Sequence, residues 1–448
     1  MEITLNKKNS TEGLIKIRVT EGDYQPHVEE KVKDYARKAN IKGFRQGKVP
    51  TGVIKKMFGK SILVEEINHL LSHKLSDYIK ENNLKILGEP LPDQQKALSI
   101  DWDTQKNFEF DYEIGMVEDF NYELSSKVKV KSYPIEVDAK VIEETITDLK
   151  KRFGKVSYPE VSEASDNLFG ELHSADPDFK REHAFIAIEN VEKKEQKKFI
   201  GLKKDEQVEF EISKLFSDDA HVAQLLGISL EEAKSANGKY ILKINTISRT
   251  EPAESNQELF DRVFGKDAVK SDEEFIAKIK ETIGENYKRE SDHFFEHHIE
   301  DYYVENTSIN LPDNFLKTWL KTSSKGEVTD DVIEKEFDIY KRGLKWDLVK
   351  NRIAEDNKIS VEADEVRAKA KDLIIAQFGG RAFAEQISDK LDGITDNYLQ
   401  NENGQNFMKL YNQLRAEKIL KLIREKITVQ EKKVTVDEFK KIVEEHKH

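Results

Sequence analysis

The alternation of apolar and polar residues predicts several strands and helices near the start of the chain. Residues 14–20 alternate between the two kinds, which predicts a half-buried strand. A helix capped by Asp23 should follow, and apolar residues three or four positions apart predict a longer helix over 67–79. A second alternating run, 108–114, predicts another strand. Together these elements indicate a small α+β domain over residues 1–114.

The middle of the chain has short alternating runs bounded by turn residues, the pattern of a β-rich domain. The runs cover 185–188, 208–212 and 240–247. Asn237-Gly238 is a strong turn signal before the last run. We therefore expect a compact β-rich domain over residues 155–247.

The remaining segments have helical periodicity. Residues 115–154 contain an extended linker and a helix that Asp138 can cap, and residues 248–448 are helical almost throughout. The apolar stripes of these long helices are narrow. The expected fold class is therefore α+β, multidomain and elongated, with long helices that build arms more readily than a single globule.

The amino-acid composition excludes several kinds of functional site. Hydrophobic residues make up 37% of the 448 residues and charged residues 35%, with a net charge of −13. The chain has no cysteine, which excludes a disulfide scaffold, a thiol nucleophile and a cysteine-based metal site. It has neither a basic, apolar leader nor an apolar run of about 20 residues, so we expect a cytoplasmic protein with no membrane partner.

A basic segment between the two N-terminal helices is the feature most informative about function. Phe44 lies between Gly43 and Gly47, and Pro50 closes the segment. The nearby cations are Lys42, Arg45 and Lys48. Residues 31–60 contain ten cations and one anion, a net charge of +9, so the rest of the chain carries −22. The pattern predicts an exposed loop at the tip of a helical hairpin that contacts a polyanion. The alternative is a solvated loop with Phe44 packed against its own helices.

Residues 43–50 resemble the ribosome-docking loop of the trigger factor family, Gly-Phe-Arg-x-x-Lys-x-Pro, at every specified position. Residues 258–274 resemble the entry to that family's helical domain, and 346–366 and 434–443 resemble its later helices. The resemblance implies a ribosome-associated chaperone that docks near the exit tunnel and shields nascent chains by weak apolar contact. It also implies a body assembled from 115–154 and 248–448, on either side of a prolyl-isomerase domain of the FKBP type.

The resemblance assigns docking roles and partners. The implied ribosome-binding residues are Gly43, Phe44, Arg45, Lys48 and Pro50. Their partners would be a protein and rRNA of the large subunit at the exit tunnel, and the body would receive unfolded or nascent polypeptides. A homodimer away from the ribosome is left open. No cofactor is implied.

The middle domain departs from the FKBP pattern. The family's Phe-Ile-Pro-Gly-Phe-Glu segment is replaced by residues 198–204, which run straight into the following turn without the proline. Aromatic or apolar residues that could line a remnant prolyl pocket are Phe185, Ile186, Phe199, Phe210, Phe216 and Tyr240. The domain's own core is the favoured interpretation of these six. An active peptidyl-prolyl isomerase therefore remains the alternative function, and we assign no catalytic residue.

Two histidine pairs have the i, i+4 spacing that can place two ligands on one helix face. They are His69 with His73 and His293 with His297, the latter followed by Asp301. Neither fits His-Glu-x-x-His, so we interpret both as surface pairs and predict no metal site. A third function, an RNA-binding regulator that uses the basic hairpin, is disfavoured by the acidic remainder of the chain.

Overall fold

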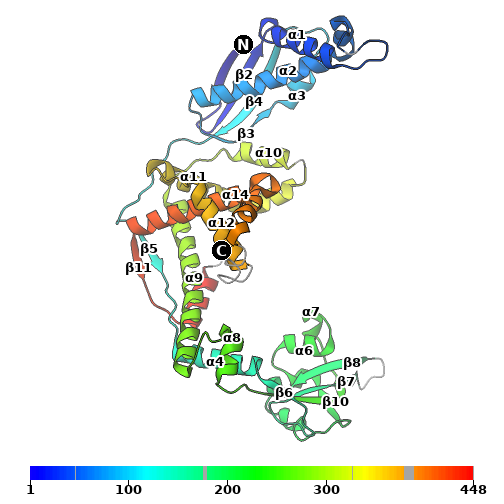
Figure 1. The fold of residues 1–448 in the computed structure, drawn as a ribbon, viewed down its shortest axis with the longest axis vertical. Coiled ribbons are helices and arrows are strands. Elements are labelled where there is room, and N and C mark those ends of the chain that lie inside the picture. The colour runs from blue at the N-terminus through cyan, green and yellow to red at the C-terminus, as the bar shows by residue number, and fades with distance from the viewer. Residues whose placement is uncertain (46, 175–178, 325, 378–387, 447–448) are drawn as a thin grey trace. The chain divides into compact units, whose positions relative to one another are not determined.

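The structure is a computed structural model that describes residues 1–45, 47–174, 179–324, 326–377 and 388–446 (Figure 1). Two compact units divide the chain. The first unit is Met1–Ser132 with Phe295–Gln430, and the second is Tyr133–Phe294 with Glu431–His448. Both units thus join segments that are distant in sequence. The predicted division at residues 114, 154 and 247 remains a prediction.

A four-stranded antiparallel sheet opens the first unit. Its strands are β1 (Glu2–Lys7), β2 (Glu12–Val19), β3 (Ile86–Pro92) and β4 (Phe108–Met116), in the order β1-β2-β4-β3. The two predicted strands are the central pair, β2 and β4, with Ile17 opposite Phe110. Alternate side chains of β2 are buried, and Phe108, Phe110 and Ile114 of β4 enter the same core. The other face of β4 is also partly covered, since Asp111 and Gly115 are buried too.

Two helices, α1 (Glu21–Lys38) and α2 (Thr51–Glu81), pack against each other as a hairpin, and a short helix, α3 (Gln94–Leu98), follows β3. The hairpin shares one core with the sheet. The predicted cap of α1 was misplaced by three residues. Thr20 is the N-cap, and Asp23 completes a capping box by accepting from the Thr20 N–H at 2.8 Å.

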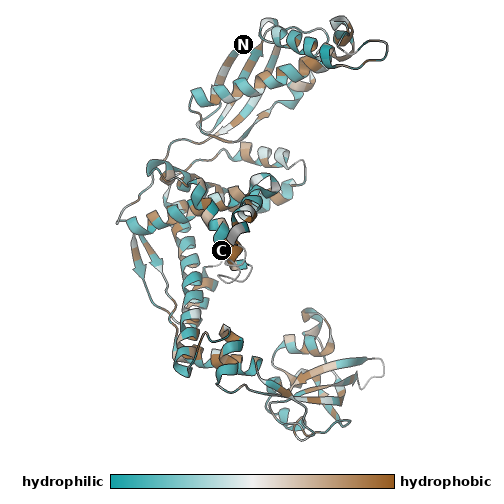
Figure 2. Cartoon of the chain, in the orientation of Figure 1, coloured by the Kyte–Doolittle hydropathy of each residue, from teal (hydrophilic) through white to brown (hydrophobic). Residues whose placement is uncertain are grey.

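Long helices complete the first unit. They are α10 (Asp313–Ser323), α11 (Asp330–Asp356), α12 (Ala363–Gln377) and α14 (Ser388–Lys426). Helix α9 (Asp272–Asn306) contributes residues to both units, and β5 (Lys129–Ser132) pairs with β11 (Thr428–Glu431). Figure 2 shows apolar positions as narrow bands between hydrophilic ones along these helices. Narrow stripes are what the sequence predicted for this region.

Two glycines let α10 approach the sheet closely. A Cβ added at Gly88 would lie 2.8 Å from the indole of Trp319. At Gly115 it would overlap the ring of Phe315 and lie 2.8 Å from Pro312. Each glycine therefore makes room for an aromatic side chain of α10, and these contacts join the sheet to the helices of the first unit.

The second unit contains a sheet in the order β6-β10-β7-β8, with β9 also paired to β10. The strands are β6 (Lys155–Ser157), β7 (Asn167–Ser174), β8 (Lys180–Ala187), β9 (Gln207–Glu211) and β10 (Lys239–Glu251). Short helices cover its core: η1 (Ile188–Asn190), η2 (Gln196–Lys198), α5 (Ile212–Leu215), α6 (Asp219–Leu226) and α7 (Leu230–Ala233). The remaining helices are α4 (Ala139–Arg152), α8 (Gln257–Phe264) and α15 (Val436–Glu445). As predicted, Asp138 caps α4, accepting from the Val141 N–H at 2.8 Å.

A buried ion pair stabilises the β-rich domain by joining Asp166 to Arg249 of β10. Asp166 is fully buried and accepts two bonds from Arg249, at 2.7 and 2.8 Å, and one from the Glu163 N–H at 2.7 Å. Burial alone would raise the pKa of Asp166, but the Arg249 and Glu163 hydrogen bonds outweigh it and lower the pKa below the ordinary value. The carboxylate is therefore held charged within the fold.

Replacing Gly115 by alanine should destabilise the first unit by about 1–3 kcal/mol, because the new methyl overpacks the Phe315 contact. Urea unfolding followed by tryptophan fluorescence measures the effect, with Trp319 close to the altered site. The matched control is Gly343→Ala in α11, where an added Cβ meets nothing within 4 Å. That control should gain about 0.5–1 kcal/mol from helix propensity. Equal midpoints for the two variants would contradict the close-packing assignment.

Asp166→Asn should weaken the β-rich domain by about 1–3 kcal/mol at pH 7, because Arg249 loses its charged acceptor. Since folding lowers the pKa of Asp166, its stabilisation is present above the unfolded pKa of about 3.9 and disappears as the pH falls through the folded pKa. Hydrogen-exchange protection in β7 and β10 should therefore differ between wild type and variant at pH 7 and converge in acid.

The control for the Asp166 variant is Glu209→Gln, which removes the exposed ion pair of Glu209 with Lys239 at 3.1 Å. That change should cost less than about 1 kcal/mol, since water screens both groups. A loss of protection as large as that of Asp166→Asn would show that burial of the ion pair is not decisive.

Candidate functional site

The loop between α1 and α2 (residues 39–50, the tip loop) is built from two successive turns. The Phe44 N–H donates to the Ile41 carbonyl at 3.0 Å, and the Lys48 N–H donates to the Arg45 carbonyl at 2.9 Å. Gly43 (φ +98°) and Gly47 (φ +77°) both adopt the left-handed region, which residues with a Cβ seldom occupy. The backbone of the loop thus favours glycine at Gly43, which the motif specifies, and at Gly47, which it does not. Gln46 lies outside the described residues.

Two apolar residues of the tip loop have opposite environments. Val49 is 5% exposed and belongs to the core that the hairpin shares with the sheet. Phe44 is 40% exposed, so its ring is not enclosed by the hairpin. The alternative in which Phe44 packs into its own helices is not what the structure shows. Its role in docking remains a prediction.

The three tip cations, Lys42, Arg45 and Lys48, are exposed, and within the described part of the chain they form no ion pair. Lower on the hairpin, Lys31 pairs with Glu65 and Glu66 at 3.3 and 3.2 Å, and Lys60 pairs with Asp103 at 2.7 Å. Four other cations of residues 31–60 form no ion pair among the described residues: Lys33, Lys38, Lys55 and Lys56. The uncompensated positive charge therefore extends from the tip along the hairpin, and the part of it beside the exposed ring favours an anionic partner.

Three further exposed side chains, Tyr35, Met57 and Phe58, form an apolar patch on the hairpin (the stem patch). The rings of Tyr35 and Phe58 are 6.3 Å apart, and Met57 is 56% exposed. The apolar repeat of α1 includes Tyr35, so the sequence pattern predicts a core position for it. The consecutive apolar residues Met57 and Phe58 were the missed signal, since two neighbouring helix positions point in different directions and do not both fit a narrow core stripe.

Three family profiles match the chain in succession. The profile described as bacterial trigger factor protein matches residues 1–149, and the probable trigger factor FKBP-like and C-terminal domains match 156–252 and 291–443. The chain belongs to the trigger factor family. The resemblance drawn from residues 43–50 is therefore confirmed at the level of the family, as is its α+β multidomain architecture.

Trigger factors of several bacteria are similar along most of the chain. The Pelagibacter ubique protein is 26% identical over 391 residues, covering 83% of this chain and 76% of the relative. The Chloroherpeton thalassium and Clostridium botulinum proteins are 22% and 23% identical, covering 83% and 88% of this chain and 87% and 94% of their own. A solved structure of the trigger factor chaperone covers 95% of this chain and 100% of its own, with 17% identity and a TM-score of 0.46.

In the FKBP-like domain, five of the six candidate pocket residues belong to one hydrophobic core and the sixth, Phe185, lies apart. Ile186, Phe199 and Phe210 are buried in its core, and Phe216 and Tyr240 pack at the edge of that core. Phe185 follows the alternation of β8 to the opposite face of the sheet. There its ring lies 5.1 Å from that of Phe169, which is exposed. Most of the set therefore stabilises the domain, and a prolyl ring would have to open the core to reach Phe199.

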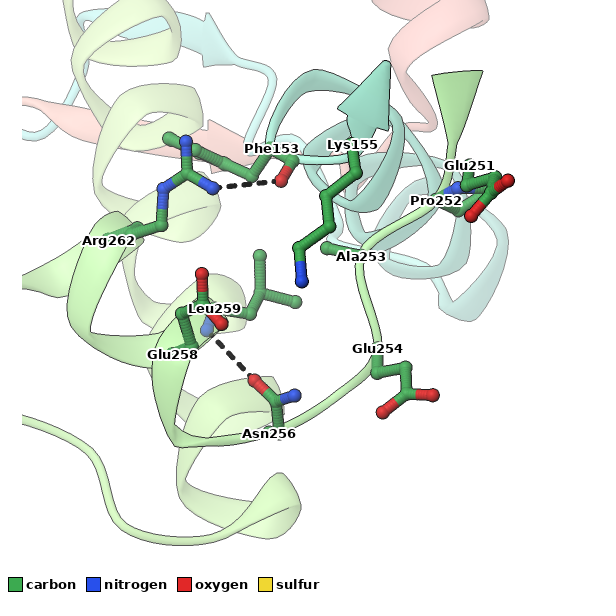
Figure 3. A pocket seen from close by; sticks show the side chains of 10 residues that line it. All are labelled: Phe153, Lys155, Glu251, Pro252, Ala253, Glu254, Asn256, Glu258, Leu259 and Arg262. Atoms are coloured by element: carbon green, nitrogen blue, oxygen red, sulfur yellow. Dashed lines mark hydrogen bonds between the residues drawn. The ribbon is translucent and has the colours of Figure 1, made fainter. Parts of the chain in front are cut away.

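A cavity of about 220 Å³ lies where the FKBP-like domain joins α8 (Figure 3). Arg262 donates to the Phe153 carbonyl at 3.0 Å and lies 5.1 Å from the centre of its ring, while Asn256 caps α8. Gly154 crosses the Glu251 carbonyl so closely that a Cβ there would clash. These contacts join the segment that enters the FKBP-like domain to the segment that leaves it. The cavity is therefore part of the connection between that domain and α8.

The described residues, whose ranges are given above, contain neither a metal-binding cluster nor a membrane-spanning helix. No group of three or more histidine, cysteine, aspartate or glutamate residues there could hold a metal ion. No helix in those ranges is both long and apolar enough to cross a membrane. The tip loop and stem patch therefore remain the leading candidate for a functional surface.

Proposed function

We propose that this protein is a ribosome-associated molecular chaperone that docks through its tip loop and shields unfolded or nascent polypeptides by weak apolar contact. The exposed ring of Phe44 beside unpaired cations is the observation that carries the proposal. Membership of the trigger factor family supports it independently.

The docking contact combines two kinds of interaction. Phe44 enters an apolar site on a large-subunit protein. Because the side chain is 40% exposed, burying the rest of it gains about 0.6–1.2 kcal/mol. Arg45 and Lys48 bind carboxylates of that protein or rRNA phosphates near the exit tunnel, and the turns closed by Gly43 and Pro50 keep these side chains outward. The stem patch extends the apolar part of the same surface. A contact of this size is strong enough to locate the chaperone yet remains reversible.

The helical body supplies the client surface. Several of its apolar side chains are exposed on α11, α12 and α14: Val332, Ile339, Leu373, Ile394 and Met408. Because apolar attraction is non-directional, scattered residues can hold many unrelated sequences weakly. Away from the ribosome, a homodimer would cover part of this surface. The proposed location is the cytoplasm, and the proposed domain boundaries are those given by the sequence.

Replacing Phe44, Arg45 and Lys48 together by alanine should abolish co-sedimentation with 70S ribosomes, because the ring and two charges of the contact are lost. Wild-type binding should also weaken with salt. Three phosphate contacts imply about a 20- to 40-fold loss of affinity between 50 and 200 mM salt. Circular dichroism should show an unchanged fold, since these side chains are exposed.

The matched control replaces Ile200, Lys193 and Lys197, one apolar residue and two cations exposed on the FKBP-like domain. This control should bind ribosomes like wild type. Retention of the tip variant on ribosomes would refute docking through the loop. Equal affinity for free RNA and for ribosomes would favour an RNA-binding regulator.

The alternative function, active prolyl isomerisation, is disfavoured because the core encloses Ile186, Phe199 and Phe210. An isomerase lowers a barrier of about 20 kcal/mol by desolvating and twisting the imide in an open apolar pocket. We therefore expect little or no acceleration in a prolyl-peptide turnover assay. If turnover is efficient and falls on replacing the half-buried Tyr240 by serine, the isomerase is the better description.

A further inference from the structure

His69 and His73 lie one turn apart on α2, on the side away from the core. Both side chains are exposed, whereas Ile67, Leu71 and Leu75 of the same helix are buried. Their rings are close, with centroids 4.4 Å apart, and the two Nε2 atoms are separated by 3.2 Å. Many helices share this spacing by chance. Here, however, the two Nε2 atoms are within hydrogen-bond distance of each other, so both ring nitrogens already face one point beside the helix.

That separation matches the bite of a metal chelate. Two imidazole nitrogens bound to one Zn²⁺ at about 2.0–2.1 Å and separated by this distance subtend an angle of about 100° at the metal. The angle lies between the tetrahedral and octahedral values. Small rotations of the exposed rings would aim both lone pairs at one ion, since no core side chain confines them.

We propose that His69 and His73 form a two-histidine site for a divalent transition metal of the zinc, nickel or copper type. Imidazole nitrogen suits these metals, whereas Mg²⁺ and Ca²⁺ prefer oxygen ligands. Water completes the coordination, because the described residues hold no group of three protein ligands. Binding is therefore exchangeable and reversed by a chelator.

The neighbouring charges of the helix favour a cation at this position. Asp77 lies one turn beyond His73 and Glu65 one turn before His69, which places both acids beside the pair. Glu65 already contacts Lys31 at 3.3 Å, so it supplies a partly compensated charge and is not counted as a ligand.

A metal ion bound by this pair would cross-link two consecutive turns of α2. The cross-link acts on the helix that leads out of the tip loop, and it would form only where the helix is folded. Binding that requires the folded arrangement stabilises it by mass action. The expected consequence is slower local opening around residues 61–81.

Calorimetric titration of the full-length protein with ZnCl₂ tests the site. The chain has 11 histidines, so the decisive quantity is the binding equivalent lost on substitution. His69→Gln and His73→Gln should each remove one equivalent, and the double variant should remove no more than either single change. Hydrogen exchange over residues 61–81 should slow with Zn²⁺ in wild type but not in the His69 and His73 variants, and titration with MgCl₂ should give no such effect.

His27→Gln and His183→Gln are the controls, since each removes one exposed histidine elsewhere. Both should retain the equivalent and the slower exchange. The proposal is overturned if the double variant keeps the wild-type stoichiometry and affinity, or if Zn²⁺ leaves the exchange of residues 61–81 unchanged. Because the four substituted side chains are exposed, circular dichroism should be the same for every variant.

Discussion

The presentation of Phe44 depends on the burial of its neighbours. Val32 and Ala36 of α1, Ile54 of α2 and Val49 at the end of the loop all enter the core shared with the sheet. The core therefore fixes both ends of the loop, and the two glycine turns carry the backbone between them. A side chain left 40% exposed forgoes about 0.6–1.2 kcal/mol of folding stabilisation, which remains available for binding a partner. The exposed ring is thus a consequence of how the hairpin is packed.

Periodicity predicted the elements whose two faces have different environments. Strand β2 alternates because one of its faces enters the core shared with the hairpin, whereas β4 is also covered on its other face, where Phe315 packs against Gly115. The cap of α4 at Asp138 is a local interaction. Strand β3 escaped prediction because it contains Gly88 and two prolines and its register shifts between Leu87 and Leu91. Strand β7 contains Gly170, which makes room for the Lys243 carbonyl of β10. In both strands a glycine is needed where another part of the chain approaches closely. Such tertiary contacts cannot be predicted from the local pattern of apolar and polar residues.

The candidate site also contains features that the sequence could predict and features that it could not. The tip loop was predictable because its turns are local and depend on the glycines at fixed spacing. The stem patch was not, because exposure of Tyr35 and Phe58 depends on how two helices rotate about each other. The arrangement of the six apolar residues of the FKBP-like domain is likewise tertiary. Phe185 and Ile186 are adjacent in sequence, yet the pleat of β8 sends them to opposite faces.

Charge distribution explains why docking through one loop is physically reasonable. Residues 31–60 carry +9, while the remainder of the chain carries −22. A uniformly basic protein would bind nucleic acid over its whole surface, but here the acidic remainder repels a polyanion wherever the hairpin is not in contact. Attraction is thereby limited to the hairpin, and the proposed docking contact adds an exposed apolar ring to the unpaired cations of its tip. Weak, spread apolar contacts can then serve clients without competing for the docking surface.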